Sequence, residues 1–310
     1  MEPSGESGGK VEGPFLSEEQ QKRFHEEGFL VLPDWWSKKA RRAHLPFDYK
    51  SGDECEEIRE RVQQVVKEMD LDEARTIFST DETKHAEDAY FLGSGDKIRF
   101  FWEPGAFDAK GEFVNDRLKC INKIGHALHD LDPVLKKYSY EKRVGQVSRD
   151  LGLASPLAVQ SMYIFKQPRI GGEVTPHQDG AFLYTEPQSV IGYWWALEDC
   201  TLSNGCLWAV PGSHRRVVKR RFKRSSTGDG CEFEPPEAEA FDVEGAVPLE
   251  VKAGTLVLLH HSVVHYSAAN TSEKSRHAYS IHVVEGKEGF RYPEDNWLQR
   301  PSDAPFQELP

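Results

Sequence analysis

Residues 156–167, PLAVQSMYIFKQ, begin the part of the chain that decides the fold. Up to this point the sequence favours helices. From here to residue 286 it consists of short runs rich in β-branched and aromatic residues, separated by turns such as Gly171-Gly172 and Pro211-Gly212. Several short strands at such spacing are typical of an antiparallel sandwich or barrel. The other runs are SVIGYWWALEDC (189–200), GCLWAV (205–210), PLEVKAGTLVLLHH (248–261) and RHAYSIHVVEG (276–286).

The residues before this region predict helices that flank the β structure. Ser17 can cap a helix that Gly28 ends, and residues 29–32 follow as a short strand. In residues 53–70, DECEEIRERVQQVVKEMD, apolar side chains recur on one helical face. A second amphipathic helix is expected around residues 120–138, CINKIGHALHDLDPVLKKY. We therefore predict a mainly β protein, a β-sandwich with N-terminal α-helices packed outside it.

Length and composition narrow the class of protein further. Residues 1–14 are rich in Gly, Ser and Glu and are expected to be disordered, and residues 15–310 are expected to form one domain because no internal repeat is visible. The net charge of −12 argues against a nucleic-acid partner. No apolar stretch approaches the roughly 20 residues of a membrane span, and the N-terminus does not resemble a secretory signal. With five cysteines in no zinc-binding pattern, we expect reduced thiols and a cytoplasmic protein.

The strongest chemical signal is TPHQDGAFLYTEP, residues 175–187. On a strand, the imidazole of His177 and the carboxylate of Asp179 would face the same side and could reach one metal ion. His265, at the end of another apolar run, can supply a third ligand. Two histidines and one carboxylate on one face of an octahedron leave three positions open, as in non-haem Fe(II) oxygenases. A 2-oxo acid can take two of these positions and O₂ the last, which a closed four-ligand zinc site would not allow.

Two residues downstream of His265 strengthen this interpretation. Ser267 lies two residues on, and Arg276 opens the run 276–286. An arginine on the adjoining strand can point into the same cavity and hold a carboxylate in a two-pronged grip. The ordinary alternative for Arg276 is a surface ion pair, and its place in the whole pattern overrides that alternative.

These residues and their surroundings resemble the phytanoyl-CoA dioxygenase family. The resemblance extends from about Phe15 to the C-terminus, and it implies a double-stranded β-helix, the cupin-like jelly-roll, with iron at one mouth. The matching stretches are LSEEQQKRFHEEGFLVL, SGDKIRFFWEPGAFDAKGEF, INKIGHALH, QSMYIFKQPRIGGEVTPHQDGAFLYTEP, LEDCTLSNGCLWAVPGSH, SRHAYSIHVVEG and PEDNWLQRP.

Carried over position by position, the resemblance implies a role for each candidate. His177, Asp179 and His265 would hold Fe(II), while Ser267 and Arg276 would hold the distal carboxylate of 2-oxoglutarate. Three further cosubstrate contacts are implied in SGDKIRF, QSMYIF and GYWWALED, namely Lys97, Met162 and Trp194. Trp194 is preferred to its neighbour Trp195, and this choice needs a one-residue gap against the family's pattern.

Other histidines compete for these roles. His260 and His261 precede His265 by five and four residues, and a single strand could place His261 on the same face as His265. We prefer His265 because only it combines the Val-Val-His context with the downstream serine and arginine. His282 could line the cavity or satisfy a hydrogen bond in the core, and we prefer the second interpretation.

The implied reaction is the oxidative decarboxylation of 2-oxoglutarate to succinate and CO₂, with O₂ as oxidant and ascorbate as a stimulant, coupled to hydroxylation of an organic substrate. Asp179 favours hydroxylation, because related halogenases lack this carboxylate. One alternative is a catalytically idle jelly-roll that senses 2-oxoglutarate or binds a partner. Another is a zinc or manganese enzyme of cupin-like fold, which would not need the pair Ser267 and Arg276.

Two segments depart from the family's pattern, and both fall where loops usually shape substrate access. One is the insertion at residues 35–53, WWSKKARRAHLPFDYKSGD. The other is the basic run from Arg215 to Arg224, which holds seven Lys and Arg residues. If this run lies at the cavity mouth, it would attract an anionic substrate such as an acyl-CoA, a phosphorylated metabolite or a nucleic-acid segment. The alternative is a solvated loop whose charge is offset by the acidic segment Glu232–Glu244.

Overall fold

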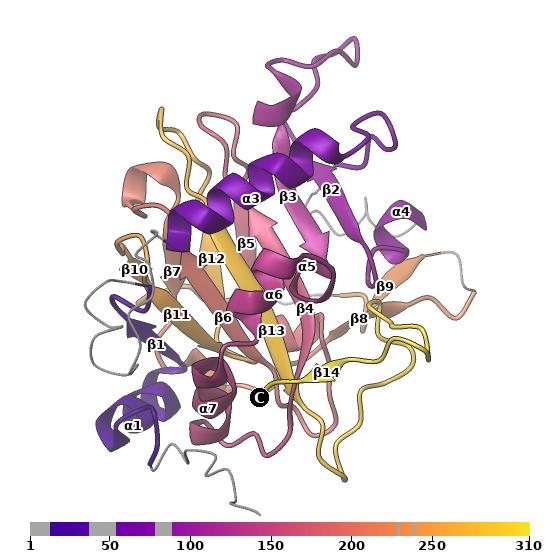
Figure 1. Cartoon of the computed structure of the whole chain (residues 1–310). Coiled ribbons are helices and arrows are strands. Elements are labelled where there is room, and N and C mark those ends of the chain that lie inside the picture. The colour runs from indigo at the N-terminus through magenta and orange to yellow at the C-terminus, as the bar shows by residue number, and fades with distance from the viewer. Residues whose placement is uncertain (1–12, 37–53, 78–88, 228–229, 238–239) are drawn as a thin grey trace, which may run out of the picture.

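Two β-sheets face each other in the computed structural model, and helices cover the outer face of the larger sheet (Figure 1). The structure describes residues 13–36, 54–77, 89–227, 230–237 and 240–310. The segment expected to be disordered, 1–14, and the insertion 35–53 therefore lie almost wholly outside the described residues.

The larger sheet is antiparallel throughout and provides the framework of the molecule. β14 (Gln307–Glu308) also pairs with the first residues of β4, which β3 does not cover, so the end of the chain returns to the sheet. Its strands, in spatial order, are β1 (Phe29–Leu32), β11 (Leu256–His260), β6 (Ile191–Ala196), β13 (Ala278–Glu285), β4 (Pro156–Ile164), β3 (Ile121–His126) and β2 (Ile98–Trp102).

The smaller sheet brings together segments that are distant in sequence. Its order is β10 (Val247–Leu249), β7 (Leu207–Ala209), β12 (His265–Ser267) and β5 (Val174–His177). A separate hairpin of β8 (Arg221–Arg224) and β9 (Cys231–Glu234) holds the second half of the basic run. The expected antiparallel jelly-roll is confirmed.

The helices follow the expected pattern at the N-terminus but not around residue 120. Ser17 and Gln20 form a capping box, and Gly28 ends the first helix with a left-handed φ of 85°. The helix expected around 120–138 is wrong in its first part, because residues 121–126 form a fully buried strand between β2 and β4. The helices are α1 (Glu18–Glu27), α3 (Glu54–Glu68), α4 (Ala89–Leu92), α5 (Leu128–Leu131), α6 (Pro133–Ser139) and α7 (Lys142–Asp150), with 3₁₀ turns at Arg117–Lys119, Asp179–Ala181, Leu202–Asn204 and Ser213–Arg215.

The side chains of β6 alternate between the two faces of the larger sheet: one face packs on the helical layer and the other faces the smaller sheet. Tyr193 and Trp195 point toward the helical layer, where Trp195 stacks on Trp36 with ring centroids 5.1 Å apart. The intervening Trp194 and Ala196 pack instead with residues of the smaller sheet. Because successive side chains on a strand alternate, this register puts Trp194 in the space between the sheets.

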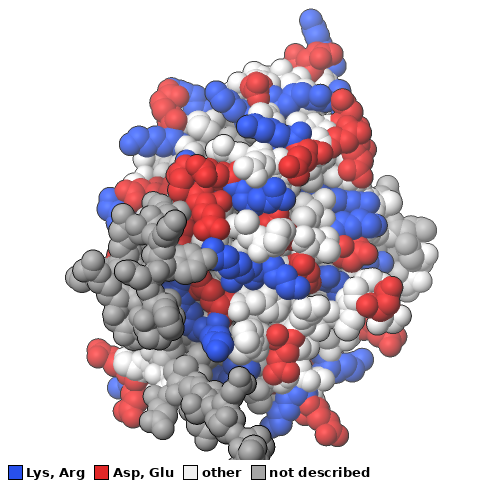
Figure 2. Space-filling view, viewed as in Figure 1, with Lys and Arg blue, Asp and Glu red and all other residues white. Residues whose placement is uncertain are grey.

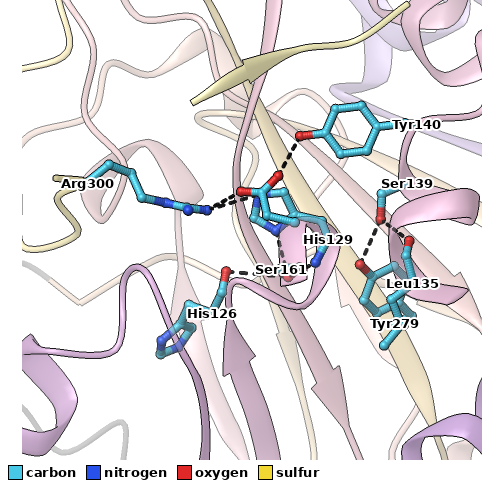
Figure 3. Close-up of polar contacts among 9 residues, drawn as sticks. His126, His129, Leu135, Ser139, Tyr140, Ser161, Tyr279 and Arg300 are labelled. Atoms are coloured by element: carbon cyan, nitrogen blue, oxygen red, sulfur yellow. Dashed lines mark hydrogen bonds and ion pairs between the residues drawn. The ribbon is translucent and has the colours of Figure 1, made fainter. Parts of the chain in front are cut away.

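A buried polar network fixes the helical layer to the large sheet (Figure 3). The hydroxyl of Ser161 on β4 accepts the backbone N–H of His129 in α5 at 3.1 Å. Arg300 forms an ion pair of 2.6 Å with Asp130, which also accepts the Tyr140 hydroxyl at 2.8 Å. The network therefore ties α5, β4 and the C-terminal segment into one unit, and leaves the opposite face of the sheet for the site.

Charges of both signs alternate over the helical face (Figure 2). Lys137 pairs there with Glu57 at 3.0 Å, and Arg61 reaches inward to the buried Asp132 at 2.6 Å. Within the described residues, no helix is both long and apolar enough to cross a bilayer.

Candidate metal and cosubstrate site

The two candidate histidine ligands meet because β5 and β12 pair in the smaller sheet. His177 ends β5, His265 begins β12, and the two are directly opposite in the register. Asp179 does not continue β5 as expected but opens a 3₁₀ turn. The backbone N–H of Gly180 donates to the carbonyl of His261 at 2.8 Å and so anchors this turn. A Cβ at position 180 would lie 2.5 Å from the Gln188 amide oxygen and 3.0 Å from the backbone carbonyl oxygen of His261, so a side chain there would displace the end of Gln188 and crowd that carbonyl.

The resulting group has the geometry of a metal site. The Nε2 atoms of His177 and His265 lie 3.6 Å and 3.5 Å from Oδ1 of Asp179, and the three ligand atoms all lie within 4.8 Å of one another. The Nδ1 atoms face the carbonyl oxygens of Thr175 and Val263, at 2.9 Å and 3.1 Å. A carbonyl oxygen can only accept, so these contacts place the proton on Nδ1 and leave each Nε2 lone pair directed at the shared centre.

The electrostatics of the group suit a divalent cation. Burial lowers the pKa of His177 to about 4, with a further contribution from His265, so this imidazole is neutral at physiological pH. Burial alone would raise the pKa of the Asp179 carboxyl, but the imidazoles of His265, His282 and His177 outweigh it and hold that pKa below its ordinary value. Neutral imidazole and ionised carboxylate are the forms that bind metal.

The second carboxylate oxygen of Asp179, Oδ2, packs against strand β6 of the larger sheet. A Cβ at Gly192 would lie 2.8 Å from Oδ2, so only glycine allows the carboxylate to approach β6. His282 Nε2 lies 3.3 Å from the same oxygen, in a contact that does not meet the geometry of a hydrogen bond. The donor set and this tight support fit the two-histidine, one-carboxylate site of non-haem iron.

The sequence left open whether His261 is a metal ligand and whether His282 lines the cavity, and the positions of the two side chains decide both questions. His282 lines the cavity, so our preference for a purely structural role was wrong. The ring of His261 packs on His260 with centroids 3.9 Å apart, and among the described residues the metal-like cluster contains His265 instead.

Arg276 is buried beside the site with unused hydrogen-bonding capacity. Its side chain is 1% exposed, its Nε donates to the carbonyl of Gly205 at 3.1 Å, and its Cζ lies 5.2 Å from the ring of Trp194. One terminal nitrogen, Nη1, is buried without a partner. Leaving a buried charged donor unsatisfied is costly, which points to an anion that Arg276 binds. Ser267, two residues after His265 on β12, is buried in the same region.

A cavity of about 950 Å³ opens next to the triad. His177, Asp179 and His282 line it, together with Met162 and several aromatic side chains. The aromatic lining residues are Phe91, Phe182, Phe222, Phe233, Phe241 and Trp297.

Among the predicted cosubstrate contacts, Met162 lines this cavity, while Trp194, Ser267 and Arg276 are buried outside its lining. Lys97 differs from all four. Its side chain is exposed, and its carbonyl serves the fold by accepting the backbone N–H groups of His126 and Ala127. Lys123 on β3 is buried, lines the cavity, and places its Nζ 3.7 Å from the sulfur of Met162. Burial lowers the pKa of Lys123 to about 7. Sequence reasoning missed it because INKIGH was assigned to a helix.

We expect Lys123→Met to raise the apparent KM for 2-oxoglutarate roughly tenfold, because it removes a buried amine that faces the cavity and can donate hydrogen bonds to a carboxylate there. The same substitution at Lys97 should leave KM unchanged, since that side chain is in solvent. Succinate formation at varied 2-oxoglutarate would measure both. Equal effects at the two positions would contradict the assignment of Lys123.

The basic run divides into a structural half and a cavity half. Arg221 pairs with Asp295 at 2.5 Å, Lys223 with Glu234 at 2.6 Å, and Arg224 donates to the carbonyl of Trp297. The cavity is lined by three other members of the run and by three acidic residues, which are Arg216, Lys219, Arg220, Glu237, Asp242 and Glu244. The seven positive charges therefore do not act as one patch.

A jelly-roll with a His-x-Asp…His cluster at the end of the smaller sheet, beside a buried arginine, defines the class of Fe(II)- and 2-oxoglutarate-dependent oxygenases. Residues 24–278 match the family model for phytanoyl-CoA dioxygenase. The chain belongs to the phytanoyl-CoA dioxygenase family.

Its relatives are similar along almost their whole length. Phytanoyl-CoA dioxygenase of Arabidopsis thaliana is 44% identical over 285 residues, covering 92% of this chain and 94% of that protein. Phytanoyl-CoA dioxygenase domain-containing protein 1 of Rattus norvegicus is 47% identical over 302 residues, covering 95% and 98%. The solved structure of the epimerase SnoN with Fe³⁺, alpha ketoglutarate and nogalamycin RO shares the fold at a TM-score of 0.59 and 16% identity, covering 93% and 91%.

Proposed function

We propose that this protein couples the oxidative decarboxylation of 2-oxoglutarate, to succinate and CO₂, to the hydroxylation of an organic substrate. The observation that carries the proposal is the convergence of His177, Asp179 and His265 on one centre. Bound Fe(II), with O₂, would supply the oxidative chemistry, and the protein would supply the ligands, the orientation and a sheltered cavity.

Each residue of the site has a defined task in this proposal. The two imidazoles present Nε2, and the Asp179 carboxylate supplies the negative charge that favours a divalent ion. Arg276 and Ser267 hold the distal carboxylate of 2-oxoglutarate, with Trp194 beneath the guanidinium. Because this clamp is buried, its charge-assisted hydrogen bonds are stronger than they would be in water.

The decisive experiment incubates the purified protein with Fe(II), 2-oxoglutarate, O₂ and ascorbate and without further substrate. Metal-dependent release of CO₂ from 2-oxoglutarate supports the oxygenase over a binding-only jelly-roll, which would bind the cosubstrate without consuming it. A cupin-like zinc or manganese enzyme would need no 2-oxoglutarate. Metabolite extracts should then be searched by mass spectrometry for a product that gains one oxygen atom.

The cavity supports an amphipathic substrate with an anionic group. Buried and half-buried aromatic side chains line it, together with three exposed or half-buried basic side chains. An apolar body would pack against the aromatic rings, and a carboxylate or phosphate, as in an acyl-CoA or a phosphorylated metabolite, would face Arg216, Lys219 and Arg220.

For such a substrate, kcat/KM should fall by several-fold as salt rises from about 0.01 M to about 0.15 M, where the Debye length shrinks from about 30 Å to about 8 Å. The uncoupled turnover of 2-oxoglutarate should change much less, because the clamp is buried. Replacing Arg216, Lys219 and Arg220 with Ser should flatten the salt dependence of substrate turnover.

Three exposed lysines elsewhere, Lys22, Lys67 and Lys110, provide a matched control when replaced by Ser. A rate that rises with the loss of the three cavity charges would instead assign the charged mouth to a cationic substrate, recognised by Glu237, Asp242 and Glu244.

A further inference from the structure

Lys166 is a fully buried lysine whose side chain ends at the proposed carboxylate clamp. It follows β4, is 1% exposed, and has a left-handed backbone with φ of 42°. Its Nζ donates to the carbonyl of Gly172 at 2.6 Å and to the hydroxyl oxygen of Ser267 at 2.9 Å. A buried ammonium and an unfavourable backbone region are retained only where the surroundings impose them, and such features cluster at ligand sites.

Lys166 and Arg276 are positioned by the same residue. The carbonyl of Gly205 accepts Arg276 Nε, and a Cβ at position 205 would lie 2.7 Å from Cε of Lys166. A side chain at this position would therefore displace the lysine. The backbone of Lys166 takes part as well, since its carbonyl accepts the backbone N–H of Arg276 at 3.3 Å.

Within the described residues, no carboxylate forms an ion pair with Lys166 or Arg276. Burial, and after it the charge of Arg276, lowers the pKa of Lys166 to about 7, while Glu103 and Glu173 act in the opposite direction. One oxygen of Glu103 already accepts from Asn122 and from the backbone N–H of Gly172. Burial also raises the pKa of Glu103. A ligand carboxylate would balance the pair.

We propose that Lys166 is the second cation of the cosubstrate clamp and that, with Arg276 and Ser267, it selects a 2-oxo acid that carries a distal carboxylate. This inference rests on the proposed function. Because the Ser267 oxygen accepts from Lys166, its single O–H proton is directed away from the lysine and can be donated to a ligand. The ammonium keeps one of its three N–H donors for the same carboxylate.

The test compares two inert ligands that share the metal-binding half of 2-oxoglutarate. N-oxalylglycine has the distal carboxylate, and pyruvate lacks it. Calorimetric titration of the full-length protein loaded with Zn(II) in place of iron measures both affinities without turnover. Lys166→Met should weaken N-oxalylglycine binding at least tenfold and change pyruvate binding less than twofold. Lys22→Met, at an exposed helix position, serves as the control.

Each result separates the possible roles of Lys166. Equal weakening of both ligands would reduce Lys166 to a structural support, and unchanged affinities would remove it from the clamp. If the wild-type protein binds neither ligand, the proposed function fails before the inference is reached.

Lys166→Gln, which keeps a donor for the Gly172 carbonyl, repeats the test if the methionine variant does not fold. If neither variant folds, N-oxalylglycine but not pyruvate should slow reductive methylation of Lys166 in the wild-type protein, followed by peptide mass spectrometry. The absence of such protection would overturn the inference.

Discussion

Replacing Asp179 with alanine should reduce the decarboxylation of 2-oxoglutarate by more than about 100-fold, because even partners of metal ligands typically change affinity or activity by 10–100-fold. The substitution removes the only carboxylate of the described metal-like cluster and leaves its two imidazoles. The fold should persist, because the substitution removes the buried carboxylate that contacts three histidines and does not leave a buried charge without its partner.

Two measurements check this prediction, namely CO₂ release from 2-oxoglutarate and the iron content of the purified protein. Asp199→Ala, which removes an exposed carboxylate that pairs with Lys252, is the matched control and should retain both. His265→Ala should resemble Asp179→Ala, whereas His261→Ala should keep the metal. If Asp179→Ala decarboxylated at the wild-type rate, the assignment of the triad would be wrong.

The sequence predicted the strands well where apolar and aromatic residues alternate between turns. In SVIGYWWALEDC the alternation sends Trp195 to the helical layer and Trp194 to the interior, as β6 shows. The failure at residues 121–126 has a physical cause. This strand is buried on both faces and carries polar side chains (Asn122, Lys123 and His126) among its apolar ones, so it lacks the period-two alternation by which a half-buried strand is recognised. Only the pairing of β3 with β2 and β4 decides between the two structures.

The metal-like cluster was predictable because His177 and Asp179 are close in sequence and His265 lies within a recognisable pattern. The lysines were not, because their position depends on long-range register. Lys123 reaches the cavity only because β3 pairs beside β4, and Lys97 is left outside by the same pairing. Lys166 escaped notice because its direction is set by a left-handed turn after β4, which no periodicity describes.

Arg276→Lys should raise the apparent KM for 2-oxoglutarate about ten- to hundredfold, corresponding to roughly 1.5–3 kcal/mol for a lost charge-assisted hydrogen bond. The guanidinium uses Nε to hold the Gly205 carbonyl and still has Nη1 for a carboxylate. A lysine ends in one nitrogen on a thinner stem, so it cannot reproduce this fork. A lysine at position 276 would also place a second compact ammonium near the ammonium of Lys166. Burial already disfavours the charged form of Lys166.

Iron content should be unchanged in this variant, because Arg276 is not part of the metal-like cluster. The comparison of KM for 2-oxoglutarate with bound iron therefore separates a defect in the clamp from a defect in the metal site. Pyruvate affinity, measured with Zn(II), should also stay within twofold of the wild type, because this ligand has no distal carboxylate. A KM equal to that of the wild type would place the cosubstrate away from Arg276, and its unpaired Nη1 would then need a different anion.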